Sequence, residues 1–281
     1  MKEEKYLTIR DSVVRQSNSF ILNKRFKKFK LSMQQQKIMF FLTSRIQPDD
    51  KDFEEYTFKI VDFCRVCGLD SVGGHSYEII KDSVQALADK SVWVKKNDDE
   101  KDDTEILLRF IDKAEISKES GTIKVVISDD MKPYLLQLRK NYTSFELLYT
   151  LRFKKKASPR LYEILKSRHY DKLKPYIYEI EVEQLRELLN ADDKETYKTY
   201  KYFNNQVIKP AVQEINEQTD ITVTYKPKKS GRSVEAVVFT IETKPPIERL
   251  HIGDEIDAAF GNPQLTLAYN LKQQQKGSKN G

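Results

Sequence analysis

The sequence has little of what several large classes of protein require. Only two cysteines occur in 281 residues, too few for a disulfide framework, so we expect a reducing, cytoplasmic compartment. No apolar run approaches the roughly 18 residues that cross a bilayer, and the charged first ten residues lack the apolar centre of a signal peptide. We therefore expect no membrane partner. Nine glycines and nine prolines are too few for a loop-dominated fold.

Motifs of phosphoryl chemistry are also missing. No Gly-x-x-x-x-Gly-Lys-Ser/Thr loop is present, which argues against a P-loop ATPase. A DNA nickase needs a metal-binding histidine pair beside a nucleophilic tyrosine, but His75, His169 and His251 lie far apart in the sequence. We therefore expect no enzyme and no catalytic residue.

Two weaker motifs have simpler interpretations. Cys64-Arg-Val-Cys67 has the spacing of half a zinc site, but no second cysteine pair completes it. We interpret the pair as small apolar residues on a short helix. The acidic run Asp98–Asp103 could bind Mg²⁺, but a solvated turn is the simpler interpretation. No metal and no cofactor are expected.

Aromatic residues and charge are abundant. The chain has 15 tyrosines, 14 phenylalanines, 39% hydrophobic residues and 33% charged residues, enough for a real core. The net charge of +6 is uneven: residues 1–139 hold 25 basic and 24 acidic side chains, whereas residues 140–281 hold 24 and 19. This bias is compatible with a polyanionic partner and also with ordinary surface charge.

Hydrophobic periodicity predicts two series of elements in the same order. The first comprises helices over 32–46, 61–69 and 76–90, with strands over 56–60, 91–94, 105–111 and 122–127. The second comprises helices over 145–155, 159–170, 181–189 and 197–218, with strands over 176–180, 221–225 and 235–241. Ser32 is a plausible N-cap, and Ser158 opens the helix that has Pro159 at its first position.

Each series runs through helices, a short strand, two helices and a hairpin, which is the order of a winged helix. The predicted fold class is therefore α+β, with two tandem winged-helix domains as a pseudo-repeat and a disordered C-terminal tail. We expect an N-terminal domain over 1–139 and a second winged-helix domain over 140–244. Residues 245–281, rich in Gln, Lys and Gly, are expected to be the tail.

The helix over 197–218 is the best candidate for a DNA-reading helix, since the second helix of a helix-turn-helix enters the major groove. Its apolar stripe comprises Tyr200, Phe203, Val207, Ala211 and Ile215. The remaining face is free of acids from 198 to 209 and presents Lys198, Lys201, Tyr202, Asn204, Asn205 and Lys209. Lysine can serve guanine or phosphate, and asparagine can bond adenine bidentately. The alternative is an ordinary solvated helix face.

Further basic residues frame this helix. Lys228, Lys229 and Arg232 occupy the predicted hairpin tip and suit phosphate contacts by a wing. Ser158 and Arg160 follow the Lys154–Lys156 cluster at a helix start, where backbone N–H groups favour a phosphate.

The corresponding helix of the first domain is less basic. It offers His75, Ser76 and Lys81 near its start, but also Glu78 and Asp82. Two alternatives stay open: this domain touches DNA lightly, or it serves mainly for protein–protein contact.

The segment Tyr202–Tyr225 followed by Lys229-Ser-Gly-Arg232 resembles the signature of iteron-binding plasmid replication initiators, the Rep family of theta-replicating plasmids. Its Pro-Ala, Glu-Ile-Asn and Thr-Asp-Ile elements carry the resemblance. Ser158–Leu165 is similar to the family's Ser-x-Arg-Leu-Tyr-Glu element, and Asn23 with Leu31–Met39 resembles its first helix. The similarity spans about 10–242. The family often has Arg where Asn205 or Gln206 stands here, so contacts there differ.

The resemblance implies a mechanism for the chain. Monomers would bind direct repeats of double-stranded origin DNA through both domains, and homodimers formed through the first domain would bind an operator and repress the protein's own gene. Origin-bound monomers would help to open A·T-rich DNA and recruit the host replication initiator and replicative helicase. Alternatives are a winged-helix transcriptional regulator and, from a different class, a metal-dependent origin nickase or primase.

Overall fold

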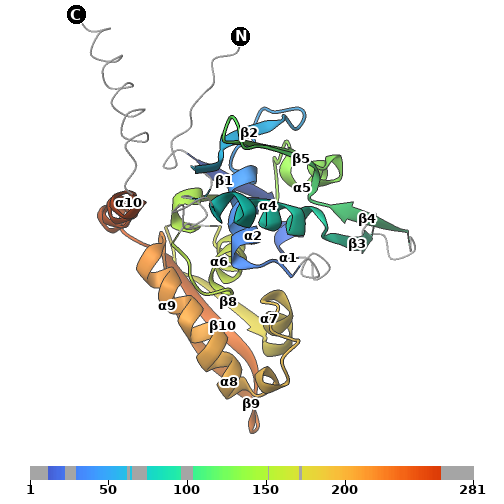
Figure 1. The fold of residues 1–281 in the computed structure, drawn as a ribbon. Coiled ribbons are helices and arrows are strands. Elements are labelled where there is room, and N and C mark those ends of the chain that lie inside the picture. Colours follow the sequence, from blue (N-terminus) through green and yellow to red (C-terminus); the bar gives the residue numbers. More distant parts are fainter. Residues whose placement is uncertain are drawn as a thin grey trace, which may run out of the picture.

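The computed structural model describes residues 12–22, 30–61, 64, 75–95, 104–150, 152–170 and 173–260. Its elements fall into two units joined by one helix, α6 (Ser158–Arg168) (Figure 1). The predicted helix over 61–69 and the acidic run at 98–103 lie outside the described residues, apart from Val61 and Cys64.

The first unit contains the elements of the N-terminal half. They are β1 (Val13–Ser17), α1 (Asn18–Leu22), α2 (Met33–Thr43), β2 (Tyr56–Lys59), α4 (His75–Ala88), β3 (Ser91–Lys95), β4 (Glu105–Arg109), β5 (Ile111–Ser117), β6 (Thr122–Ile127), η2 (Asp129–Met131), α5 (Lys132–Leu135), β7 (Tyr142–Glu146) and η3 (Leu147–Thr150). The Ser32 cap is confirmed: its hydroxyl accepts a hydrogen bond from the Gln35 N–H at 3.2 Å, and the Gln35 side chain accepts one from the Ser32 N–H at 2.9 Å. Such a cap stabilises a helix by about 1 kcal/mol.

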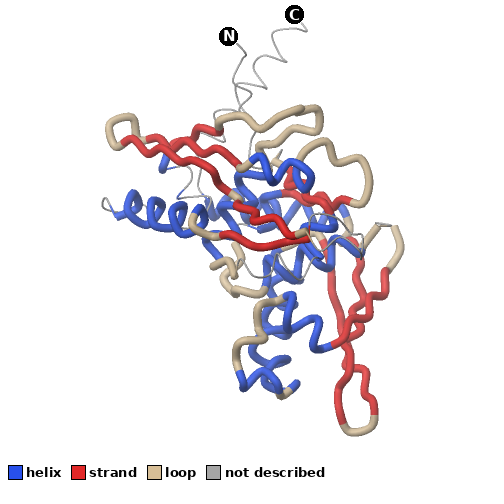
Figure 2. The backbone as a smooth tube through the Cα atoms, turned by 90° about the vertical axis from the view of Figure 1, so that its right-hand side faces the viewer, coloured by secondary structure: helices blue, strands red, loops and turns tan. Residues whose placement is uncertain are grey.

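The second unit follows α6. It comprises β8 (Tyr176–Glu181), α7 (Val182–Leu188), η4 (Glu195–Lys198), α8 (Tyr200–Phe203), the π-helical turn η5 (Asn204–Ile208), α9 (Lys209–Gln218), β9 (Ile221–Ser230), β10 (Ser233–Thr243) and α10 (Pro246–Phe260). Together, α8, η5 and α9 form one continuous helix, which we call the recognition helix. The β9–β10 hairpin extends away from the body of the unit (Figure 2).

The two units share a sheet topology, which confirms two tandem winged helices. In the second unit the strand order is β8-β10-β9, and in the first it is β2-β6-β5, all antiparallel. In each sheet the short early strand pairs with the last strand of the hairpin. The first unit adds a second hairpin, β3–β4, in which Trp93 pairs with Leu107.

A continuous core connects the units. Phe40 of α2, Phe145 of β7 and Tyr162 of α6 stack edge to face, with ring centroids 5.4 and 5.3 Å apart. Aromatic pairs of this kind add about 0.5–1.5 kcal/mol beyond their burial. β7 follows the predicted boundary at residue 139 but pairs with β1 of the first unit, and α6 packs on α9 of the second.

Two predictions of local structure are wrong. The helix expected over 145–155 is instead β7 followed by the short turn η3, because β7 pairs with β1 (Val13 opposite Glu146). All four residues of η3, Leu147–Thr150, are buried, and an all-buried run carries no period that would separate strand from helix. The tail was expected from 245, but residues 246–260 form α10, which buries Ile252 and Ile256.

Candidate nucleic-acid interface

The recognition helix buries an apolar stripe and exposes its polar face. Phe203, Val207, Ala211 and Ile215 are buried as predicted, with Tyr200 partly buried, whereas Lys201, Tyr202, Asn205 and Lys209 are exposed. Lys198 lies just before the helix, exposed and ion-paired with Glu195 at 2.9 Å. The predicted DNA-reading face, residues 198–209, contains no acid, and the nearest one along the chain is Glu195.

The π-helical turn in this helix has a local cause. Pro210 carries no N–H to donate to the carbonyl four residues earlier, and its ring would clash with that carbonyl. A π-turn over Asn204–Ile208 widens the helix directly before the proline. Because it adds one residue to a turn, it also brings both Val207 and Ile208 into the core.

Asn204 and Asn205 are linked to the hairpin. The Tyr225 hydroxyl of β9 donates to the Asn204 Oδ1 at 2.8 Å, and the Asn204 amide donates to the Asn205 Oδ1 at 3.3 Å. The predicted site residue Asn204 is therefore half-buried and engaged inside the protein, and Asn205 is the one of the pair exposed to a ligand.

The hairpin tip carries the predicted wing residues. Lys228, Lys229 and Arg232 are exposed around Gly231, whose φ of 60° is a left-handed conformation that suits glycine. Lys228 is ion-paired with Glu179 of β8 at 2.6 Å, which also raises the pKa of the Lys228 amine through that hydrogen bond and charge. Within the part of the chain that the structure describes, Lys229 and Arg232 form no ion pair with a carboxylate.

A basic loop, Lys154–Lys156, is held against the recognition helix by a buried acid. The Glu214 carboxylate accepts hydrogen bonds from the backbone N–H groups of Lys154 and Lys155, each at 3.0 Å, and from the Ser158 hydroxyl at 2.6 Å. The three lysine side chains are exposed. Burial, and then the charge of Lys156, lower the pKa of Lys90 after α4, so basic groups of both units lie close together here. Close like charges favour a bound anion such as phosphate.

Glu214 was not foreseen from the sequence as part of the site. It stands beside Ile215 in the buried stretch of α9, and a buried acid needs a hydrogen-bond partner. An acid next to the apolar stripe was therefore the sequence signal that could have indicated this contact.

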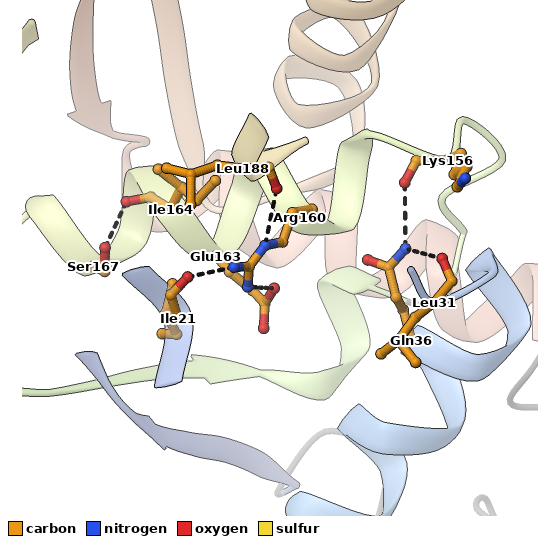
Figure 3. Close-up of polar contacts among 9 residues, drawn as sticks. All are labelled: Ile21, Leu31, Gln36, Lys156, Arg160, Glu163, Ile164, Ser167 and Leu188. Atoms are coloured by element: carbon orange, nitrogen blue, oxygen red, sulfur yellow. Dashed lines mark hydrogen bonds and ion pairs between the residues drawn. The ribbon is translucent and has the colours of Figure 1, made fainter. Parts of the chain in front are cut away.

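Two predicted phosphate contacts are corrected by burial. Ser158 is fully buried and donates to Glu214 rather than capping α6, whose N-cap is Ala157. The Arg160 side chain is 12% exposed and donates to the carbonyls of Ile21 and Leu188 and to Glu163 (Figure 3). Backbone and carboxylate oxygens within the protein thus occupy the donors that were expected to face phosphate.

Glu163 makes stability depend on pH. Burial raises the pKa of its carboxyl from 4.5 to about 7, although the charge of Arg160 and its hydrogen bond act in the opposite direction. Because the folded protein holds the proton more tightly, this contribution is fully present below pH 4.5 and is lost as the pH rises through 7. Relative to Glu163→Gln, we expect the unfolding free energy of the wild type to fall by about 3 kcal/mol between pH 4.5 and 8. Urea titrations across that range measure it; a constant difference between the two proteins would contradict the prediction.

The corresponding surface of the first unit, around α4, is less basic. His75 and Ser76 begin α4, but their side chains lie outside the described residues. Lys81 is exposed, as are Glu78 and Asp82, and Glu78 receives a long 3.5 Å ion pair from Lys118. The acids noted in the sequence therefore do reach the solvent beside Lys81.

Signature residues of the second unit are structural. Asn216 exchanges two hydrogen bonds with the backbone of Val223, at 2.7 and 2.9 Å, which ties the recognition helix to β9. Asp220 accepts hydrogen bonds from Tyr162 and Lys166 of α6, both at 2.7 Å. These contacts fix the recognition helix between α6 and the hairpin.

Other chemistry finds no support in the described part of the chain. Within it, no group of three or more His, Cys, Asp or Glu side chains is placed to hold a metal ion, and Cys64 is buried. Cys67 is outside the described residues. None of the described helices is long and apolar enough to span a membrane.

Comparisons with known proteins agree with this architecture. The family model described as "Initiator Replication protein, WH1" matches residues 13–166, and the one described as "Initiator Rep protein, WH2" matches residues 181–241. A replication initiation protein of Escherichia coli is 27% identical over 124 residues, which are 44% of this chain and only 38% of that protein.

A solved structure is also similar. The Pi initiator protein, crystallised in complex with iteron DNA, superposes with a TM-score of 0.69 at 20% identity, over 84% of this chain and 98% of that one. At this identity the likeness establishes a shared fold.

Proposed function

Because the chain belongs to the initiator replication protein family and carries both of its winged-helix domains, we propose that it starts plasmid replication by binding directly repeated origin DNA. In this proposal the second unit provides most of the affinity, and the protein acts in the cytoplasm without a covalent step or a cofactor. The crystallised Pi initiator is in complex with iteron DNA, which supports the choice of ligand.

One observation carries the proposal. The exposed face at the start of the recognition helix is free of acids from 198 to 209, and Tyr225 of the hairpin contacts Asn204 within it. The recognition helix and the β9–β10 hairpin therefore lie side by side (Figure 1). A helix of this kind can read base edges with Lys201 and Asn205 while the wing contacts phosphates.

The first unit offers a surface for the proposed homodimer. Trp93 and Leu107, cross-strand partners in the β3–β4 hairpin, are 53% and 42% exposed. Exposed aromatic and aliphatic pairs of this kind are enriched where proteins associate. We propose that dimers formed here bind an operator and repress the gene, and that DNA-bound monomers recruit the host replication initiator and replicative helicase.

Base reading and phosphate contact are separable by mutation. Asn205→Ala should weaken binding to the repeats flanking the coding sequence by about 1–3 kcal/mol, with little effect on scrambled DNA. Lys229→Ala should weaken binding to both DNAs alike and reduce the salt slope by about 0.9. Lys229 is a sharper probe than Lys228, whose amine is already paired with Glu179. Fluorescence anisotropy at several salt concentrations measures both effects.

A matched control lies further along the same helix. Gln213 is exposed and hydrogen-bonds Glu217 at 2.9 Å, away from the predicted reading face. Gln213→Ala should leave both affinities unchanged. If Asn205→Ala lost equal affinity for repeat and scrambled DNA, the recognition helix would not be the element that reads bases. If the wild type bound the two DNAs with equal affinity, the proposed function itself would be wrong.

A further inference from the structure

Arg160 connects the ends of two helices that belong to different units. Its Nη2 donates to the carbonyl of Ile21 in the last turn of α1, and its Nε donates to the carbonyl of Leu188, the last residue of α7, at 3.3 Å (Figure 3). The final carbonyls of a helix have no partner within it, and they lie at the negative end of its dipole. A single guanidinium therefore satisfies two helix C-termini at once.

The Arg160 side chain is mostly shielded from solvent, and a carboxylate holds its guanidinium in place. The remaining donor of the fork, Nη1, pairs with the carboxylate of Glu163 one turn along α6, at 3.3 Å, and that side chain is 1% exposed. The planar guanidinium offers its donors in a fixed geometry, so the three oxygens determine where α1 and α7 lie relative to α6.

Glu214 and Asp220 hold the second unit to α6 and to the loop before it. The polar links that join the first unit to residues on either side of α6 are weaker than the Arg160 contacts. The Lys30 amine of the first unit pairs with Asp193, which follows α7, but both side chains are 52% exposed. Exposed pairs contribute little. The Gln36 amide of α2 reaches the carbonyl of Lys156 at 3.4 Å, which is a long hydrogen bond and involves the loop before α6 rather than α7 (Figure 3).

We propose that Arg160 is the positioning residue that sets the separation and angle between the two DNA-binding units, so that the protein accepts only one spacing between its two subsites on DNA. The reason is the place of α7 in the chain: it is the α-helix that precedes the recognition helix, with only the short turn η4 between them. Holding the end of α7 against α1 therefore orients the recognition helix relative to the first unit. This inference rests on the proposed function for its ligand, but not for its geometry.

Spacing is a sensitive readout of rigidity. Each base pair inserted between the two subsites moves one of them by about 3.4 Å and rotates it by about one tenth of a turn. Two rigidly connected units cannot reach both subsites after this translation and rotation, whereas two loosely connected units can. The ratio of affinities for native and shifted spacing cancels any loss of folded protein, so a purely structural defect would leave it unchanged.

The DNA test uses the full-length chain. The two subsites are mapped by footprinting, and affinities are measured for the native repeat and for repeats with one or two inserted base pairs. For the wild type we expect a preference of about 100-fold for native spacing, and for Arg160→Gln a preference within about 5-fold. Arg160→Lys, a point charge that cannot reach both carbonyls, should be intermediate. Asp193→Asn, which weakens the exposed link to Lys30, should behave as the wild type.

A second measurement needs no DNA. Fluorophores on Glu119→Cys in the β5–β6 turn and Ser230→Cys at the wing tip, with the native cysteines replaced, report the distance between the units by energy transfer. Arg160→Gln should broaden this distance distribution, and Asp193→Asn should not. An unchanged distribution in Arg160→Gln, or a retained 100-fold spacing preference, would overturn the inference. A wild type that binds no repeat would refute the proposed function, while the distance measurement would still decide the role of Arg160.

Discussion

Replacing Asp220 by alanine should lower the free energy of unfolding by about 3–5 kcal/mol, the usual effect of removing one partner of a buried ion pair. Asp220 accepts hydrogen bonds from Tyr162 and Lys166, and the Lys166 side chain is only 6% exposed. Without the carboxylate, a buried ammonium and a buried hydroxyl lose their partner. Urea denaturation followed by circular dichroism measures the change.

The double variant Asp220→Ala with Lys166→Met is the matched control. Because it removes both charges together, it should recover much of the lost stability, as apolar replacements of whole buried pairs often do. A loss below about 1 kcal/mol in the single variant, or no recovery in the double variant, would contradict a buried pair as the cause.

Low pH should diminish the loss of stability caused by Asp220→Ala. Burial alone would raise the pKa of Asp220, but the charge and hydrogen bond of Lys166 and the hydrogen bond of Tyr162 outweigh it, so the pKa lies below its usual 3.8. A lowered pKa stabilises the folded protein above 3.8 and loses that contribution as the pH falls through the folded value. The difference between wild type and Asp220→Ala should therefore shrink below about pH 4.

Neutralising the basic loop should produce the largest change in DNA binding. Lys154, Lys155 and Lys156 are exposed, and the loop is held in place by Glu214. If each lysine meets a phosphate, the triple Lys→Gln variant loses about 0.9 of salt slope per contact, or about 10²-fold in affinity near 0.1 M salt. The loss should be equal for repeat and scrambled DNA, because phosphates carry no sequence information.

A triple variant with the same change in charge tests the specificity of this effect. Lys113, Lys118 and Lys124 of the β5–β6 hairpin are each paired with an acid, at most 3.5 Å away. Their replacement by Gln should leave the salt slope within error of the wild type. If both triple variants lowered the slope equally, the net charge of the protein rather than the loop would be responsible.

Glu214→Gln separates the position of the loop from its charge. A glutamine keeps one acceptor for the two N–H groups and the Ser158 hydroxyl that the carboxylate now satisfies. The three lysines remain, so we expect a loss of affinity smaller than that of the triple variant.

Much of the second unit could be predicted from local pattern. Alternation located β9 and β10, and the 3.6-residue period located the recognition helix with its buried stripe at Phe203, Val207 and Ala211. These signals are reliable because one side of each element faces the core and the other faces water. The exposed reading face followed from the same pattern.

The failures share one cause, which is partners distant in the sequence. The run around Phe145 is a strand because β1, more than 120 residues earlier, pairs with it. Arg160 was expected to meet phosphate, yet its donors are occupied by Ile21 and Leu188. Glu214 and Asp220 were recognised only as part of a signature segment, since their partners lie on α6 and the loop before it.

The sequence by itself determined the two winged-helix units, the acid-free face of the recognition helix over 198–209 and the basic wing, because these depend on periodicity and on charge that must face water. Only the tertiary structure decided which polar side chains form hydrogen bonds within the protein and which stay exposed to a ligand. Ser158 is buried and the Arg160 side chain is only 12% exposed, whereas Lys154–Lys156 are exposed. The physical reason is that a buried polar group must find a partner, and that partner is chosen by the fold rather than by neighbours in the sequence.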